Sequence, residues 1–97
     1  MSENEIEAKM RKTFKVHKVL FVKFISPSMT GVPDRIVITP NGRIIFVELK
    51  RDGGVISPMQ KYVHRLLRRY HVEVRVVIGF REAMQFVEEV CREYECC

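Results

Sequence analysis

The sequence predicts a single α/β domain in which a mixed four-stranded sheet is flanked by helices, in the chain order αβββαβα. The length of 97 residues fits one domain, and no repeat or linker divides it. Three runs rich in β-branched and aromatic residues follow one another between residues 19 and 50, separated by loop and turn residues. A fourth run, residues 72–78, lies between two stretches in which apolar residues recur at helical spacing.

The first two predicted elements are a helix over residues 3–15 and a strand over residues 19–25. Ser2 followed three residues later by Glu5 fits a capping box, which starts a helix. The strand is β-branched and aromatic, and Ser26-Pro27 ends it. The residues that give the first helix its spacing are Ile6, Met10, Thr13 and Phe14.

The second and third strands are expected over residues 35–39 and 43–50, with Pro40-Asn41-Gly42 between them. Asn-Gly alone favours a two-residue type I′ turn. The preceding proline favours instead a type I turn closed by a left-handed glycine, which makes a three-residue loop. Both strands are largely apolar on both faces, so we expect the sheet to be covered on both sides.

The length of this turn decides which side chains share a face of the sheet, because residues alternate faces along a strand. With the three-residue loop, Asp34 pairs with Glu48, and Lys50 follows two residues later on the same face. A two-residue turn would shift the register by one residue and place Asp34 opposite Leu49 instead. The turn that the sequence favours is therefore the one that gathers two acids and a lysine.

The remaining elements are a helix that starts at Ser57-Pro58, a strand over residues 72–78 and a final helix. Serine as N-cap with proline at the first helical position is typical of a helix start. The apolar stripe of the first of these helices consists of Met59, Val63, Leu66, Leu67 and Tyr70. The final helix is marked by Ala83, Phe86, Val87, Val90 and Cys91.

The composition indicates a basic globular protein, with a net charge of +5, a pI near 9.4 and 46% apolar residues. A basic surface favours a polyanionic partner through contacts with phosphate groups. No apolar run approaches the roughly 20 residues of a membrane span, and we expect the acidic start not to be a signal peptide. The expected location is therefore cytoplasmic, without secretion. Cysteines without paired spacing predict reduced thiols rather than a zinc site: Cys91, Cys96 and Cys97.

Two carboxylates and a lysine on one face, as predicted for Asp34, Glu48 and Lys50, are what a metal-dependent phosphodiester hydrolase needs. The acids supply the oxygen ligands that hard divalent cations prefer, and the lysine positions the attacking water or offsets charge at the phosphate. Glu48 also interrupts an apolar run, where a buried charge is expensive unless it is paired or metal-bound. A structural salt bridge with Lys50 or Arg35 is the alternative.

These residues resemble the PD-(D/E)xK nuclease superfamily and, within it, the VRR-NUC family of small viral-type replication-repair nucleases. The resemblance covers nearly the whole chain and its predicted order of elements. One departure is Ser28-Met29-Thr30, where the family loop is often rich in glycine and arginine, which puts phosphate contacts from this loop in doubt. The match rests on residues 23–27 (KFISP), 31–36 (GVPDRI), 46–51 (FVELKR) and 57–60 (SPMQ).

The resemblance implies a restriction-endonuclease-like core that cleaves DNA with Mg²⁺ or Mn²⁺ and without an organic cofactor, in a bacterial or virus-infected cell. It implies that Asp34, Glu48 and the carbonyl of Leu49 hold the metal, with Lys50 acting on the attacking water or the developing charge. A glutamate on the first helix reaches the site in that family; Glu7 is the best match and Glu3 the alternative. A glutamine also points at the site there, which implies a role for Gln60 beside its place in a capping box.

Basic residues expected to contact nucleic acid are Lys23, Arg35, Arg51, Lys61 and Arg65. Lys23 either extends to solvent or faces the scissile phosphate. Lys61 and Arg65 belong with Arg68 and Arg69 to a basic stripe, for which a solvated helix face is the alternative. No ligand spacing is visible around the histidines, and none is given a role: His17, His64 and His71.

The resemblance further implies a homodimer that acts on branched DNA such as Holliday junctions. A chain this short buries a small core, and Phe21, Ile25, Phe80 and Met84 exceed what one thin sheet and three helices must cover. The first helix and the region after Asp52 are the expected interface. A non-catalytic nucleic-acid-binding module with the same fold and an RNA-processing nuclease are the alternative functions.

Overall fold

The sheet of the computed structural model, which describes residues 1–95, contains four strands in the spatial order β1-β2-β3-β4. Strands β1 and β2 pair antiparallel, as do β2 and β3, whereas β3 and β4 are parallel. The predicted mixed sheet is therefore confirmed. The chain order is also the predicted one: α1 (Glu3–Val16), β1 (Leu20–Lys23), β2 (Arg35–Ile38), β3 (Ile44–Lys50), α2 (Pro58–Arg69), β4 (Val74–Ile78) and α3 (Gly79–Glu95).

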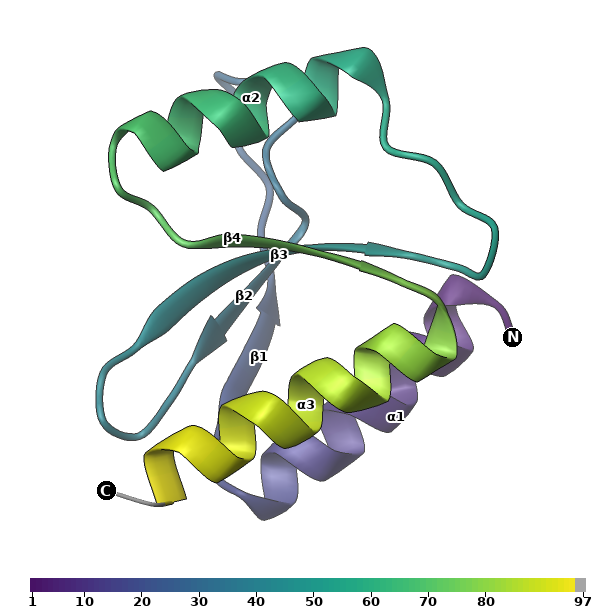
Figure 1. The fold of residues 1–97 in the computed structure, drawn as a ribbon, viewed down its shortest axis with the longest axis vertical. Coiled ribbons are helices and arrows are strands. Elements are labelled where there is room, and N and C mark those ends of the chain that lie inside the picture. Colours follow the sequence, from purple (N-terminus) through teal and green to yellow (C-terminus); the bar gives the residue numbers. More distant parts are fainter. Residues whose placement is uncertain (96–97) are drawn as a thin grey trace.

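The helices lie on both sides of the sheet (Figure 1). Helices α1 and α3 pack side by side on one face, and α2, which connects β3 to β4, lies on the other. The face under α1 and α3 carries the core, where the ring of Phe14 lies 5.3 Å from that of Phe21 and 6.3 Å from that of Phe86. Further buried members of this core are Ile6, Met10, Val37, Ile45, Val47, Leu49, Val77, Val87 and Val90.

The turn between β2 and β3 has the predicted three-residue form. The Gly42 amide donates to the Thr39 carbonyl at 2.9 Å, and the Thr39 amide donates to the Arg43 carbonyl at 2.9 Å. Gly42 has a φ of +90°, a left-handed conformation that side chains rarely adopt. The pairs Arg35–Val47 and Ile38–Ile44 follow from this turn.

The starts of α1 and α2 are fixed by two complete capping boxes, as predicted. Ser2 and Glu5 exchange hydrogen bonds at the start of α1, and Ser57 and Gln60 do the same at the start of α2. Each box satisfies amide groups that have no partner inside the helix. The residues at which α1 and α2 begin are therefore set by the local sequence.

The buried side of α2 differs from the predicted apolar stripe. Val63 and His64 are the buried residues of this helix, whereas Met59 and Tyr70 are 52% and 73% exposed. The stripe prediction was wrong at both ends, because α2 lies over the edge of the sheet and only part of its apolar side has a surface to cover.

The sheet face toward α2 is open at the β1 side, which corrects the expectation that both faces are covered. The strand register places Leu20 beside Ile38 and Ile38 beside Ile44 on this face. Leu20, Val22 and Ile44 are 58%, 42% and 53% exposed. Helix α2 packs against β4, at the opposite edge of the sheet. We call Leu20, Val22, Ile38 and Ile44 the open apolar face.

The burial of core residues corrects two expectations about which apolar residues are free to contact a partner chain. Phe21 is buried, and so are Ile6, Met10 and Phe14 of α1, so these residues are not available to a partner chain, whereas Val16 at the end of α1 is 75% exposed. Cys91 is buried in the same core, and Cys96 and Cys97 lie outside the described residues. None of the helices described is both long and apolar enough to cross a membrane.

Candidate active site

The predicted acids meet on the face of the sheet that α2 overlies. Asp34 directly precedes β2, and continuing the register one residue beyond the Arg35–Val47 pair places Asp34 opposite Glu48. Its backbone is tied to the end of β1, since the Phe24 amide donates to the Asp34 carbonyl at 2.9 Å. Its side chain is tied to β3, since the Leu49 amide donates to Asp34 Oδ1 at 3.2 Å. The predicted juxtaposition of Asp34 and Glu48 is therefore confirmed.

The loop before Asp34 passes beneath α2 because Gly31 has no side chain. Its φ is +94°, and a Cβ at this position would lie 3.0 Å from atoms of both Met59 and Val63. Any other residue would push α2 away from the sheet or displace the loop. This close approach explains physically why a glycine precedes Pro33 and Asp34.

Glu48 is a buried acid at the centre of this arrangement, only 2% exposed. Its Oε2 lies 3.6 Å from Lys50 Nζ, which shares its face of β3. No described residue gives a hydrogen bond to its Oε1. Burial, and then the nearby charge of Asp34, raise the pKa of Glu48 to about 7, against the opposing effect of Lys50.

His64 is the residue of this site that sequence analysis missed. It is 2% exposed, and its Nε2 lies 3.9 Å from Glu48 Oε1. Burial, followed by the charge of Arg68, lowers the pKa of His64 and so favours the neutral imidazole. A signal was present in the sequence, because His64 follows Gln60 by one helical turn and lies at the margin of the apolar stripe.

The donor set of the site fits a hard divalent cation that keeps part of its water shell. Among the side chains that the structure describes, no group of three or more His, Cys, Asp or Glu is arranged to hold a metal. Two carboxylates suffice for Mg²⁺, which retains several waters. The unpartnered Oε1 of Glu48 is the observation that favours a cation here, because a buried carboxylate oxygen without a partner is otherwise costly.

The glutamates of α1 differ in their relation to Glu48. The Glu7 carboxylate is engaged by Arg11, whose Nε donates to Glu7 Oε1 at 2.7 Å. Arg11 in turn donates to the Phe21 carbonyl at 2.8 Å. Glu3, the alternative candidate, is close enough for its charge to contribute to the raised pKa of Glu48. The role predicted for Glu7 stays a prediction, and in this geometry Glu3 has the electrostatic link to the site.

The Gln60 side chain serves the start of α2. Its Oε1 accepts a hydrogen bond from the Ser57 amide at 2.9 Å, and its own amide N–H donates to Ser57 Oγ at 3.1 Å. The capping role of Gln60 is therefore confirmed. Its second predicted role, at the active site, stays a prediction.

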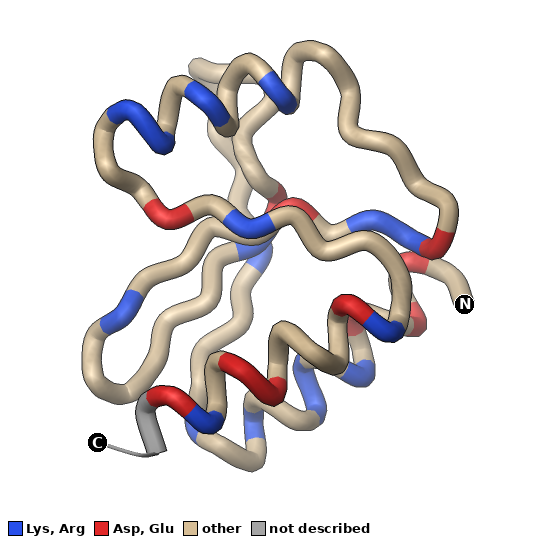
Figure 2. Tube along the Cα trace, viewed as in Figure 1, with Lys and Arg blue, Asp and Glu red and all other residues tan. Residues whose placement is uncertain are grey.

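Three basic residues of α2 line a hollow of about 350 Å³ that reaches His64: Lys61, Arg65 and Arg68. Lys and Arg recur along this helix, and acidic residues lie in the sheet beneath it (Figure 2). Lys61 and Arg65 are exposed and line the hollow, while Arg68 also donates to the Val74 carbonyl at 2.8 Å. The two residues predicted to contact nucleic acid on this helix therefore share a hollow with His64, the neighbour of Glu48.

The other predicted contacts with nucleic acid lie in different settings. Lys23 pairs with Arg35 across β1 and β2, so both belong to the face opposite Glu48. Arg35 is only 5% exposed, and its Nη1 lies 3.3 Å from Asp34 Oδ2. Arg51 is exposed and donates to the Asp52 carbonyl. The contacts predicted for Lys23, Arg35 and Arg51 with nucleic acid stay predictions. The burial of Arg35 does not support the contact predicted for that residue.

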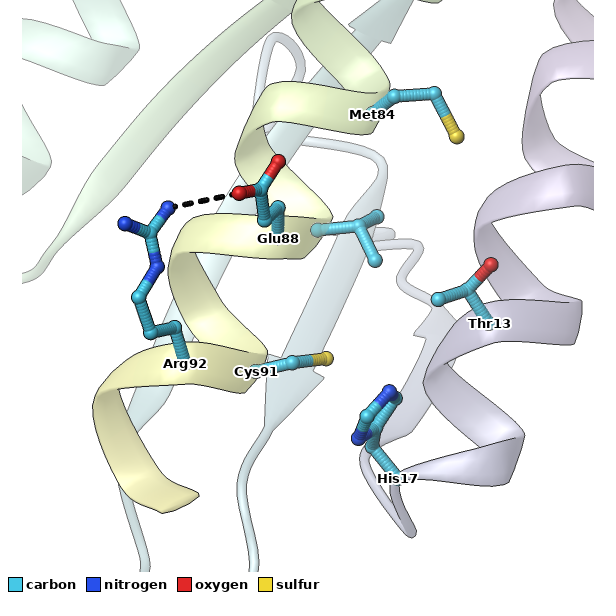
Figure 3. Close-up of a pocket in the computed structure, with 7 residues that line it drawn as sticks. Thr13, His17, Met84, Glu88, Cys91 and Arg92 are labelled. Atoms are coloured by element: carbon cyan, nitrogen blue, oxygen red, sulfur yellow. Dashed lines mark hydrogen bonds and ion pairs between the residues drawn. The ribbon is translucent and has the colours of Figure 1, made fainter. Parts of the chain in front are cut away.

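A second hollow lies between α1 and α3 (Figure 3). Its volume is about 480 Å³, and it is lined by Thr13, His17, Met84, Val87, Glu88, Cys91 and Arg92. Glu88 and Arg92 form an ion pair at its rim. None of the predicted site residues belongs to this hollow, so the chemistry is assigned to the face under α2.

Comparison with known proteins finds similarity to a phage protein in sequence and to solved domains in structure. No family model matches the chain. It is 53% identical over 45 residues to "Putative nuclease p44" of Acyrthosiphon pisum secondary endosymbiont phage 1, a match that covers 46% of this chain. The matched part spans about half (48%) of the length of that relative.

The structural relatives cover almost the whole chain. A solved structure described as "VRR_NUC domain" superposes with a TM-score of 0.80 and 28% identity, covering 91% of this chain and 97% of that one. A second, "VRR_NUC domain protein", gives a TM-score of 0.67 at 16% identity, over 92% and 87%, and bears on the fold alone. The chain therefore has the fold of a VRR_NUC domain, and the resemblance to the VRR-NUC family that its sequence predicts is confirmed.

Proposed function

We propose that this chain is a metal-dependent DNA endonuclease that prefers branched substrates such as Holliday junctions. The observation that carries the proposal is the buried Glu48, which lies beside Asp34 and Lys50 on one face and whose Oε1 has no hydrogen-bond partner in the part of the chain that the structure describes. Its support from relatives is the nuclease name of the phage protein and the VRR_NUC fold. The salt bridges of Glu48 with Lys50 and of Asp34 with Arg35 do not account for the unpartnered Oε1 of Glu48.

In this proposal, Asp34, Glu48 and the Leu49 carbonyl hold Mg²⁺ or Mn²⁺. The ion, when bound, lowers the pKa of a water molecule and offsets negative charge at the phosphate. Asp34 is held for this role by the Leu49 amide. Lys50, 24% exposed, is the cation of the site with access to solvent, and it orients the attacking water or stabilises the developing charge.

The exposed cations of α2 supply the contact with the DNA backbone in this proposal. Lys61 and Arg65 line the hollow that reaches His64, whose Nε2 lies 3.9 Å from Glu48 Oε1. Lysine and arginine neutralise phosphate groups without reading the sequence of bases. The chain therefore favours a substrate recognised by its shape, and its affinity should fall steeply with salt.

A homodimer built on the open apolar face is part of the proposal. Leu20, Val22 and Ile44 are exposed on the face of the sheet that also carries Glu48. A twofold axis there would bury apolar surface and direct both sites toward one substrate. The interface should be isologous and bury at least about 1,000 Å² in total.

Purified protein incubated with Mg²⁺ and labelled duplex DNA, four-way junction and RNA tests the proposal. We expect cleavage of the junction in preference to the duplex. Cleavage of RNA alone would indicate an RNA-processing nuclease, and binding without any cleavage would indicate a non-catalytic module. Either result would contradict the proposed function.

A further inference from the structure

His64 and Glu48 face each other from two different elements, α2 and β3. The Nε2 atom of His64 and the Oε1 atom of Glu48 are 3.9 Å apart, and both are buried. Neither atom has a hydrogen-bond partner among the described residues. Two unpartnered polar atoms aimed at one another, in residues that are each 2% exposed, are rare in a packed protein.

An apolar residue at position 64 would pack against the sheet without leaving a polar atom unpartnered. Val63, its neighbour on α2, is an apolar residue with the same 2% exposure. The imidazole therefore has a use other than filling space. A shift of about 1 Å would bring Nε2 within hydrogen-bond distance of Oε1, and the neutral imidazole has one N–H to donate.

We infer that His64 is a positioning residue for the metal site: its Nε2–H donates to one lone pair of Glu48 Oε1 and fixes the orientation of the carboxylate that would hold the cation. The inference rests on the proposed function, since it assigns a task in binding the cation. It differs from a role as direct ligand, in which Nε2 would carry no proton. Partners that fix a ligating side chain typically alter metal affinity by about 10- to 100-fold when removed.

Two substitutions separate the hydrogen bond from the packing. His64→Gln keeps an N–H donor near the position of Nε2, whereas His64→Phe keeps a ring but has no donor. Val63→Ala serves as the matched control, because it removes a buried contact of the same helix and leaves the donor in place. Thermal unfolding of each variant shows whether it is folded.

Titration with Mn²⁺, followed by calorimetry, is the first readout. We expect His64→Phe to weaken Mn²⁺ binding by about tenfold or more, His64→Gln to restore most of the affinity, and Val63→Ala to bind as the unsubstituted protein does. If His64→Phe does not fold, His64→Asn replaces it, because its shorter amide does not reach Oε1, and the same loss is expected.

Nitrogen-15 NMR of the imidazole is the second readout, and a packing role would not move it. We expect Nε2 to carry a proton in the Mg²⁺-loaded protein. Wild-type Mn²⁺ affinity in His64→Phe or His64→Asn would overturn the inference about His64 and leave the proposed function standing. Loss of the Nε2 proton when Mg²⁺ binds would do the same. Absence of Mn²⁺ binding by the unsubstituted protein would instead overturn the proposed function, and the inference with it.

Discussion

At the scale of single residues, the site depends on one unfavourable placement. Glu48 is buried in the strand β3, and its pKa is raised to about 7 because burial and Asp34 disfavour its charge. The folded protein therefore holds this proton more tightly than the unfolded chain does. The protonated Glu48 therefore contributes to the free energy of unfolding, and this contribution is fully present below pH 4.5, the pKa of the glutamate in the unfolded chain. The contribution is lost as the pH rises through about 7, the pKa in the folded protein.

We predict that Glu48→Gln stabilises the metal-free protein, and that the gain grows between pH 4.5 and pH 7. The neutral amide avoids the ionisation that burial opposes, and above pH 7 the gain should be on the order of 2–3 kcal/mol. Urea unfolding of both proteins at pH 4.5 and pH 8 measures it. An unchanged difference between the two pH values would show that Glu48 ionises without penalty.

Asp34, Glu48 and Lys50 should contribute differently to the proposed reaction. Asp34→Ala and Glu48→Ala should weaken metal binding and abolish cleavage, because each removes an oxygen ligand. Lys50→Ala should leave metal binding nearly intact and lower the rate of the bound complex. Calorimetry with Mn²⁺ and single-turnover cleavage separate the two effects. Equal loss of Mn²⁺ affinity in all three variants would contradict this division.

At the scale of elements, the turn between β2 and β3 sets the register that joins Asp34 to Glu48. This part was predictable, because proline and glycine restrict backbone angles locally. The capping boxes at Ser2 and Ser57 were predictable for the same reason. The ends of the strands were less predictable. Strand β1 ends at Lys23, two residues before the expected end.

Gly42→Val should destabilise the protein by about 1 kcal/mol or more, because a β-branched residue tolerates a φ of +90° poorly. Nothing lies within 4 Å of the Cβ position, so the loss comes from the backbone rather than from a clash. Gly42→Asn is the matched control and should lose less, since asparagine adopts left-handed angles more readily. Equal unfolding midpoints for Gly42→Val and wild type would contradict the turn assignment.

What the sequence did not predict depends on contacts between distant elements. His64 was given no role, because its burial follows from the packing of α2 against the sheet rather than from local pattern. The open apolar face was missed for a similar reason. Runs such as residues 44–47 are apolar whether a helix or a second chain covers them. Asp34 and Glu48, in contrast, were found because a turn and two strands suffice to bring them together.

At the scale of the whole molecule, three helices leave part of one sheet face uncovered. Leu20, Val22 and Ile44 are exposed at the β1 side, while α2 occupies the β4 side. An exposed apolar patch of this kind commonly marks an interface. It lies on the face that carries Glu48, so the proposed dimer and the proposed site share one side of the molecule.

We predict that Ile44→Glu converts a dimer to a monomer at micromolar concentration, because it places a charge in the proposed interface. Sedimentation equilibrium measures the mass. Tyr70→Glu, at an exposed residue outside the open apolar face and outside the region after Asp52, is the matched control and should leave the mass unchanged. A mass near one chain for the unsubstituted protein, together with full cleavage of a junction, would rule the dimer out.

The most direct test of the proposed nuclease is cleavage of a labelled four-way junction by the unsubstituted protein and by the combined Asp34→Ala, Glu48→Ala and Lys50→Ala variant, purified in parallel. The expected result is cleavage that requires Mg²⁺ or Mn²⁺, stops on addition of EDTA, and is absent from the variant although the variant remains folded. Cleavage by the variant at the wild-type rate, in a preparation free of other nucleases, would contradict the assignment of the site.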